Sequence, residues 1–235
     1  MEIVICSGIA MAYLLQVNKK KPSKEGFFFW YTSFMYSSSE KLQMMKKIRD
    51  ELLSFSKSPL YTYRQTNRYF PVIGEGSHDT HIMFVGEAPG ETEAKTARPF
   101  CGRAGKFLDE LLSSIGLDRE KVYITNVVKD RPPENRDPTL EEIKSYSPFL
   151  NRQLEIIRPQ VVVMLGRHSM NYLFEKAGIV DKLQPISKMH GQLFEGDFGY
   201  GKVSLLPLYH PAVALYNPGM RSVLFEDFRK LEEFK

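Results

Sequence analysis

The sequence predicts an α/β protein of three layers (α/β/α), with a central, mostly parallel four-stranded sheet between two layers of helices. Short apolar runs of the length of buried strands recur along the chain: "HIMFVG", "VYITNVV", "VVVMLG" and "KVSLLPL". Segments with helical spacing separate the first three, as the crossovers between parallel strands require. We also expect "KMHGQLFE" and "KVSLLPL" to form a hairpin or two further strands.

Length and composition set wide limits on function. The 235 residues suffice for one α/β domain or two small ones. A net charge of +4 permits a polyanionic partner without requiring one. Two cysteines, Cys6 and Cys101, cannot build a disulfide framework or supply four thiolates to a metal, so we expect a protein of the reducing cytoplasm.

The first 39 residues differ from the rest. Residues 3–17 are apolar, but the stretch is shorter than a membrane span and no basic residue precedes it, so we expect neither an anchor nor a signal peptide. We interpret residues 1–39 as an extension of unknown role, either disordered or upstream of the true start, and residues 40–235 as the functional domain.

Three helix boundaries are marked by capping signals. Ser39 precedes a helix over residues 40–55, whose apolar residues recur three and four positions apart: Leu42, Met45, Ile48, Leu52 and Phe55. Gly116 is suited to end a helix, and Thr139 with Glu142 forms a capping box that begins another.

Loops after the carboxyl ends of parallel strands build the sites of such sheets. The first loop, "GEAPG" over residues 86–90, is a tight turn with exposed backbone N–H groups, although a plain strand-to-helix turn would look the same. Its one ionisable residue is Glu87. Further on, "RPFCGRAG" holds Phe100 rigidly, either to stack on a planar base or to close the core.

Two polar residues stand at other strand ends. Asn126 lies within an apolar strand, where its amide must pair with a ligand or with the backbone. His210 follows "VSLLPL" and is fixed by Pro211, and it is either functional or structural.

Two loops are candidates for contact with a nucleic acid. Lys129, Arg131 and Arg136 could meet phosphates, although neighbouring acids also suit a solvated face. After His210, apolar residues could wedge into a nucleic-acid stack or pack on the last helix. They are Pro211, Ala212, Val213 and Leu215. We find no His/Cys metal spacing, no Gly-x-Ser-x-Gly elbow and no Walker loop.

The combination of motifs resembles the uracil-DNA glycosylase superfamily, and within it the family 4 enzymes. "VIGEG", "FVGEAPGETE", "RPFCGRAGKFLDELL", "VYITNVVK-RPPENRDPT" and "YHP" occur in family order and at family spacing, from about Gly74 to the C-terminus. The resemblance implies hydrolysis of the N-glycosidic bond of deoxyuridine, after the nucleotide is flipped out of DNA.

The resemblance also implies roles for the candidate residues. Phe100 would stack on uracil and Asn126 would read its polar edge. His210 would donate to the uracil O2, where negative charge grows as the base leaves. Glu87 would help with the water and the sugar, and Asn135 is a less specific helper. Gly86, Ala88, Pro89 and Gly90 would complete the uracil pocket.

One departure from the family is large. Family 4 enzymes usually hold a [4Fe–4S] cluster through four cysteines, two before the first strand and two framing the loop after the second. Here Asp130 and Tyr146 stand at two of these places, and "SPLYTYRQTNRYF" has no cysteine. Thiolates are the required ligands, so we expect no cluster and no metal.

The resulting hypothesis is a cluster-free, monomeric uracil-DNA glycosylase that acts on uracil-containing DNA and does not bind membranes. The alternative is a paralogue with weak or altered activity that binds DNA or another damaged base. A third class is a small-molecule nucleotide hydrolase on the same α/β layout.

Overall fold

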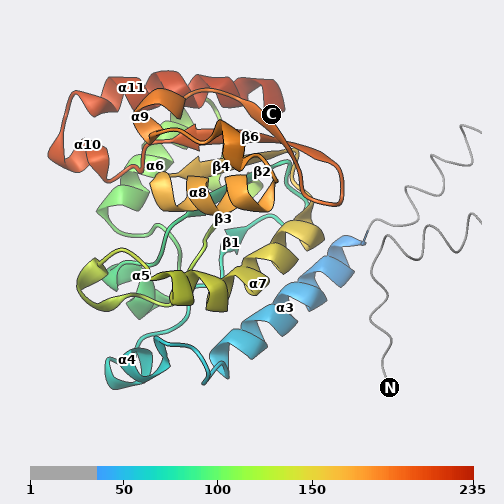
Figure 1. Cartoon of the computed structure of the whole chain (residues 1–235), viewed down its shortest axis with the longest axis vertical. Helices are drawn as coiled ribbons and strands as arrows, with labels where there is room; N and C mark the ends of the chain where they lie inside the picture. Colours follow the sequence, from blue (N-terminus) through green and yellow to red (C-terminus); the bar gives the residue numbers. More distant parts are fainter. Residues whose placement is uncertain (1–35) are drawn as a thin grey trace, which may run out of the picture. The chain divides into compact units, whose positions relative to one another are not determined.

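The sheet is larger than predicted but has the predicted centre. The computed structural model describes residues 36–235, so most of the predicted extension lies outside the described residues. Six strands lie in the order β1-β3-β2-β4-β6-β5 (Figure 1). They are β1 (Glu75–Gly76), β2 (Ile82–Gly86), β3 (Tyr123–Asn126), β4 (Val161–Leu165), β5 (Phe194–Asp197) and β6 (Lys202–Leu208).

The four central strands, β3, β2, β4 and β6, are parallel to one another, which confirms the predicted four-stranded parallel centre. The two short outer strands are antiparallel, β1 to β3 and β5 to β6. The expected hairpin is therefore β5–β6, but its first strand begins later than predicted. Of residues 188–195, only Phe194 and Glu195 belong to β5, whereas Lys188 and Met189 end a short helix. Gly199 and Gly201 adopt positive φ in the turn of the hairpin. Outer strands that run against their neighbours do not disturb the parallel centre, whose carboxyl ends meet at one edge.

Helices cover both faces of the sheet. They are α3 (Ser38–Leu53), α4 (Tyr61–Thr66), α5 (Glu91–Thr96), α6 (Arg103–Ser114), α7 (Leu140–Ile157), α8 (Arg167–Lys176), α9 (Ile186–Met189), α10 (Val213–Tyr216) and α11 (Met220–Phe228). The 3₁₀ turns are η1 (Arg119–Lys121), η2 (Pro133–Asn135), η3 (Val180–Lys182) and η4 (Arg229–Phe234).

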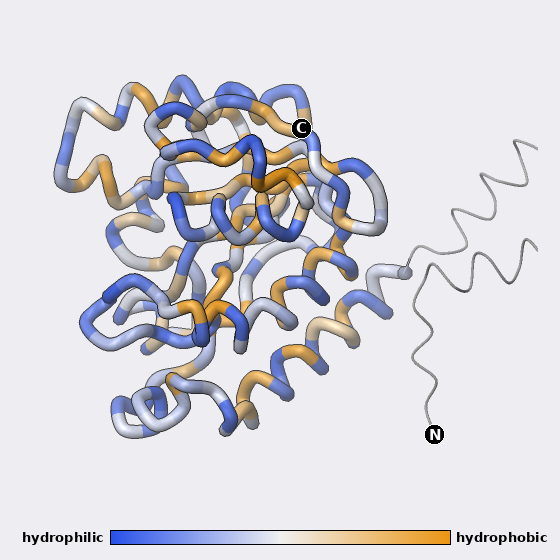
Figure 2. Tube along the Cα trace, viewed as in Figure 1, coloured by the Kyte–Doolittle hydropathy of each residue, from blue (hydrophilic) through white to orange (hydrophobic). Residues whose placement is uncertain are grey.

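The period of two along the strands divides the core. In β2, Met83 and Val85 face the apolar cluster that α3, α7 and α8 complete, whereas Ile82 and Phe84 face the cluster that α6 and α11 complete. Figure 2 shows hydrophobic and hydrophilic residues alternating along the helices. The predicted three-layer architecture is thus confirmed.

Helix α3 departs from its predicted face. Met45, Ile48 and Leu52 are buried as expected, but Leu42 is 43% exposed. Lys41 is buried in its place because its ammonium pairs with Asp79 at 2.9 Å. The helix begins at Ser38, one residue before the predicted cap Ser39.

The other two capping predictions are confirmed. Thr139 Oγ1 accepts from the backbone N–H of Glu142 at 3.2 Å, and the Glu142 carboxylate accepts from the backbone N–H of Thr139 at 2.8 Å, which begins α7. Gly116 adopts a φ of 68° two residues after α6 ends. Among the described helices, none has the length and apolar character needed to cross a bilayer.

Candidate active site

The candidate site lies where β2 and β3 end side by side. Gly86 and Asn126 are register partners in the parallel pair. Beyond them, the N–H of Val127 donates to the Gly86 carbonyl at 3.0 Å and that of Val128 to the Glu87 carbonyl at 2.9 Å. These bonds hold the "GEAPG" turn against the start of the charged loop. The carboxyl edge of the sheet therefore brings the two predicted motifs together.

Gly86 leaves room between two candidate side chains, Asn126 and Phe100. A Cβ at this position would lie 2.3 Å from Asn126 Oδ1 and 2.7 Å from Cζ of Phe100. Asn126 is 1% exposed, and its Oδ1 has no hydrogen-bond partner among the described residues. Buried polar atoms are rarely left unpaired. An unpaired amide oxygen at the carboxyl edge of the sheet points to a ligand that donates a hydrogen bond.

The loop that carries Phe100 is held in a specific conformation. Phe100 has a φ of 47°, a left-handed conformation that is uncommon for a residue with a side chain. Glu93 Oε1 fixes the loop by accepting from the N–H groups of Cys101 at 3.0 Å and Gly102 at 2.7 Å. A Cβ at Gly105 would lie 1.8 Å from the Phe100 carbonyl oxygen, so only glycine fits there.

Phe100 closes the core, which is one of the two roles that the sequence left open, and its stacking on a base stays a prediction. It is 6% exposed and packs in the apolar cluster with Phe107, yet its ring also stacks on the His210 imidazole, with centroids 5.5 Å apart. Sequence reasoning missed Glu93 as the residue that positions this ring. Its only signal was an acid in the first turn of α5.

The hydrogen bonding of His210 fixes its tautomer. The N–H of Ala212 donates to Nδ1 at 3.1 Å, so the neutral ring carries its proton on Nε2. Burial lowers the pKa of His210 to about 4, although the nearby Glu93 carboxylate acts in the opposite direction. The side chain is therefore a neutral hydrogen-bond donor near pH 7.

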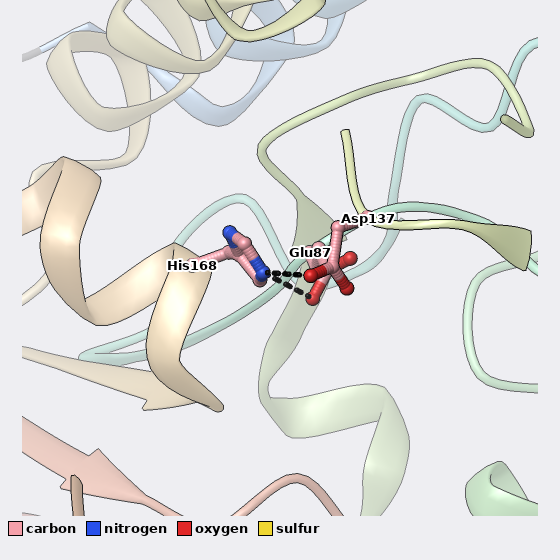
Figure 3. Close-up of side chains that lie close together, drawn as sticks. All are labelled: Glu87, Asp137 and His168. Atoms are coloured by element: carbon pink, nitrogen blue, oxygen red, sulfur yellow. Dashed lines mark ion pairs between the residues drawn. The ribbon is translucent and has the colours of Figure 1, made fainter. Parts of the chain in front are cut away.

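Glu87 faces two residues from distant parts of the chain (Figure 3). His168 Nε2, at the start of α8, lies 3.8 Å from Glu87 Oε2 and 3.2 Å from Asp137 Oδ2. Burial raises the pKa of Glu87, Asp137 adds to this effect, and His168 and Arg167 oppose it. The sequence did not single out either residue: Asp137 lies within the quoted "RPPENRDPT" motif but was counted only among the acids that balance the loop's charge, and His168 belongs to none of the quoted motifs.

The same three side chains form a group that could hold a metal ion. One ligand atom from each of Glu87, Asp137 and His168 lies within 4.8 Å of the others. However, Arg167 Nε donates to His168 Nε2 at 3.0 Å, and its guanidinium pairs with Asp137. The guanidinium thus already supplies positive charge to this cluster.

The prediction that Lys129 meets phosphates is wrong. Lys129 is fully buried. Its Nζ donates to the Thr125 hydroxyl at 2.6 Å, the Asn126 carbonyl at 2.7 Å and Gln153 Oε1 at 2.6 Å. Burial holds the pKa of Lys129 well below its usual range. The residue supports the end of β3 from below instead of facing solvent, which the alternation of charges in the loop did not reveal.

The two arginines of the loop also have partners within the protein. Arg131 donates from Nε to Asn135 Oδ1 at 2.9 Å and from Nη1 to the Tyr69 hydroxyl at 2.6 Å. Arg136 donates two hydrogen bonds to the Glu142 carboxylate, at 2.9 and 2.5 Å, and its side chain remains 41% exposed. The loop residue that lies against Glu87 is Asp137, whereas the amide of Asn135 is engaged by Arg131.

The segment after His210 is a short helix, α10, where we expected a loop. Pro211 is buried, Ala212 and Val213 are half-buried, and Leu215 is 37% exposed. The neighbouring Tyr216 is 80% exposed, more than any other large apolar or aromatic side chain of residues 36–235. It is the prominent aromatic group beside the site, and the sequence analysis did not single it out.

Comparison with known proteins gives a consistent result. The family model described as the uracil DNA glycosylase superfamily matches residues 73–232. A type-4 uracil-DNA glycosylase of Sulfurisphaera tokodaii is 47% identical over 82% of this chain and 85% of its own length. The type-4 enzyme of Saccharolobus solfataricus is 49% identical (79% and 84%), and that of Thermotoga maritima is 40% identical (85% and 97%).

Proposed function

The chain belongs to the uracil-DNA glycosylase superfamily, and from this premise we propose that it removes uracil from DNA by hydrolysing the N-glycosidic bond. The observation that carries the proposal is the convergence of Gly86, Phe100, Asn126 and His210, with the buried Asn126 Oδ1 left unpaired. The proposal includes a monomeric enzyme that works in the cytoplasm and starts base excision repair.

Asn126 supplies the choice of base. Its Oδ1 accepts from the N3–H of uracil, and its NH₂ group donates to O4. Cytosine presents an acceptor at N3 and an amino donor at C4, so both bonds would be lost and buried polar groups left unpaired. The pocket side of Gly86 must lack a side chain, because a Cβ there would displace both Asn126 and Phe100.

Phe100 contacts the face of the bound base, and His210 contacts its O2 atom. The Phe100 ring provides the apolar surface on which the flipped uracil stacks. His210 Nε2–H donates to the uracil O2 as the glycosidic electrons move into the ring, which stabilises the leaving anion. A neutral donor suits this task, because its proton is already in place at neutral pH.

Glu87 acts on the sugar side of the bond. Its carboxylate stabilises the positive charge that develops on the sugar and orients the water that attacks it. His168 and Asp137 lie against this carboxylate and define its position. Ala88, Pro89 and Gly90 continue the turn that carries Glu87, and Asn135 belongs to the loop opposite.

Contact with DNA falls to exposed groups around the site. The Arg136 side chain is 41% exposed and can reach a phosphate, whereas the Arg131 side chain is only 9% exposed and contributes little. Val213 and Leu215 on α10 follow His210 and are suited to fill the gap left by a flipped base. The exposed Tyr216 adds an aromatic face at the same place.

The decisive experiment uses an oligonucleotide duplex with a single uracil opposite guanine, incubated with excess protein and then treated with alkali. We expect strand cleavage at the uracil, and none at a cytosine or thymine placed in the same position. Free deoxyuridine serves as a second substrate. Absence of cleavage at protein excess would contradict the proposal, and hydrolysis of the free nucleoside alone would assign the chain to nucleoside chemistry.

A further inference from the structure

Asp130 and Tyr146 contact each other in the protein interior. The family resemblance places cluster cysteines at both positions. Asp130 and Tyr146 are 1% and 0% exposed, respectively. The Tyr146 hydroxyl donates to Asp130 Oδ2 at 2.5 Å, which connects the loop after β3 to the middle of α7. The two substitutions are therefore one contact, formed across sixteen positions of the sequence.

The segment before the first strand completes this contact. The Ser58 hydroxyl bonds to the Tyr146 hydroxyl and also accepts from the N–H of Leu60 at 3.0 Å. On the other side, Arg64 Nη1 donates to Asp130 Oδ2 at 3.1 Å. Ser58 and Arg64 are themselves 6% and 2% exposed. The segment that carries the other cysteine pair in the family thus reaches the same location through a hydroxyl and a guanidinium.

Arg64 extends the network to α3. It donates to the carbonyls of Leu52 at 3.0 Å and Leu53 at 3.1 Å, at the end of that helix. The side chain also lies over the ring of Tyr61, 5.0 Å from its centroid. The four residues therefore link α3, α4, the loop after β3 and α7.

These side chains do not fit an iron–sulfur cluster. A guanidinium is always positively charged and offers no lone pair to iron. Burial raises the pKa of Tyr146, so its phenol keeps the proton that it donates to Asp130. In residues 36–235 the one thiol belongs to Cys101, which lies beside Thr96 in the loop before α6. The donor set is that of an internal ion pair with its hydrogen bonds satisfied.

We propose that a buried, metal-free polar network of Ser58, Arg64, Asp130 and Tyr146 takes the structural place of the [4Fe–4S] cluster in this chain. It ties the N-terminal α3–α4 segment to the loop that leaves Asn126. The network stands independently of the glycosylase reaction, because its contacts involve neither Glu87 nor His210.

The first experiment measures metal content in the full chain. The protein is produced in cells supplied with excess iron and cysteine, purified without oxygen, and assayed for iron, acid-labile sulfide and absorbance near 400 nm. We expect a colourless protein with far less than one iron per chain. Stoichiometric iron and sulfide with a band near 400 nm would overturn the proposal, whether or not the protein cleaves uracil.

The second experiment tests whether the network carries stability. Asp130→Asn leaves Arg64 buried without its counter-ion, so we expect the melting temperature to fall by roughly 10 °C. Asp181→Asn, at an exposed carboxylate of η3, is the matched control and should leave the melting temperature unchanged. An Asp130→Asn protein as stable as the control would contradict the role of the network.

A double-mutant cycle keeps the test informative if single variants fold poorly. Arg64→Met, Asp130→Leu and the double variant are compared by chemical denaturation. Because the double variant removes both charges, it should lose clearly less stability than the two single losses added together. Additive losses would show that Arg64 and Asp130 act separately and would overturn the network.

Discussion

Asn126 and Asp130 lie four positions apart, and their polar atoms are treated in opposite ways. Both side chains are almost fully buried. Asp130 accepts hydrogen bonds from Tyr146 and Arg64, whereas Asn126 Oδ1 has no partner among residues 36–235. An unpaired buried polar group costs about 1–3 kcal/mol, and a ligand that donates a hydrogen bond to Asn126 Oδ1 would remove that cost. The contrast separates two regions. The recognition region is Asn126, the last residue of β3, and the support region is Lys129 and Asp130 in the loop that follows.

The largest expected effect concerns base selection by Asn126. Asn126→Asp replaces the amide donor with a second acceptor, so the pair with uracil O4 becomes repulsive. We expect a preference for uracil over cytosine of roughly 10⁴ to collapse, mainly through loss of cleavage at uracil. Single-turnover rates on matched duplexes measure it. A variant with unchanged preference would remove Asn126 from the recognition region.

His210 is expected to show the next largest effect. Loss of one donor to a developing anion lowers the rate by about 10²–10³-fold, so His210→Gln should reduce the chemical step by that factor. The unfolding midpoint in urea at pH 7 should change little. A reduced rate that follows reduced stability would argue instead for a structural histidine.

The lowered pKa of His210 also predicts a pH dependence of stability. The unfolded chain protonates this histidine near pH 6.5, while the folded chain resists protonation until about pH 4. More protons are then bound by the unfolded state, so wild-type stability should fall as pH drops from 6.5 to 4. Urea titrations over this range should show a shallower fall in His210→Gln. Equal slopes would contradict the assignment.

Lys129 tests the support region with a moderate effect. Lys129→Met keeps the length of the side chain but removes the hydrogen bonds of Nζ, leaving Thr125, Gln153 and the carbonyls of Ile73 and Asn126 with fewer partners. We expect a loss of about 1–3 kcal/mol in the free energy of unfolding. Salt dependence of DNA binding should stay unchanged, because the ammonium does not reach phosphates. A weaker salt dependence would restore the original prediction for this residue.

The smallest effect is expected at an exposed ion pair that also joins α3 to α7. Arg152 and Glu51 form two hydrogen bonds, with side chains 39% and 50% exposed. Arg152→Ala should cost less than about 1 kcal/mol. Chemical denaturation of Arg152→Ala and of Asp130→Asn measures both losses in the free energy of unfolding. A much smaller loss in Arg152→Ala would show that burial, rather than the pairing of charges, makes the Arg64–Asp130 contact important.

The sequence predicted the fold well because strand and helix periods are local properties. Buried runs such as "VVVMLG" and caps such as Thr139 depend on a few neighbouring residues. The two outer strands were harder to predict: β1, which has only two residues, was not expected, and β5, which contains Gly196, was expected over residues 188–195. Their pairing depends on an adjacent strand edge that no local pattern reveals.

The site was predictable where side chains meet at strand ends and less so where they turn inward. Gly86 and Asn126 converge because parallel register requires it. Lys129 was misassigned because its destination, Gln153 on α7, lies 24 positions away. Glu93 and His168 were missed because their residue types are common on surfaces. Glu93 acts on backbone N–H groups, which no sequence pattern reveals, and the carboxylates beside His168 belong to distant segments.

The hydrogen bond from the backbone N–H of Ala212 to His210 limits proton transfer during the reaction. By occupying Nδ1 of His210, it leaves a single proton on the ring, and burial opposes a second. Such an imidazole can lend a hydrogen bond but has no surplus proton to surrender. Uracil would therefore depart as an anion and collect its proton from water later. Cleavage would then proceed at nearly the same pace in heavy water as in ordinary water.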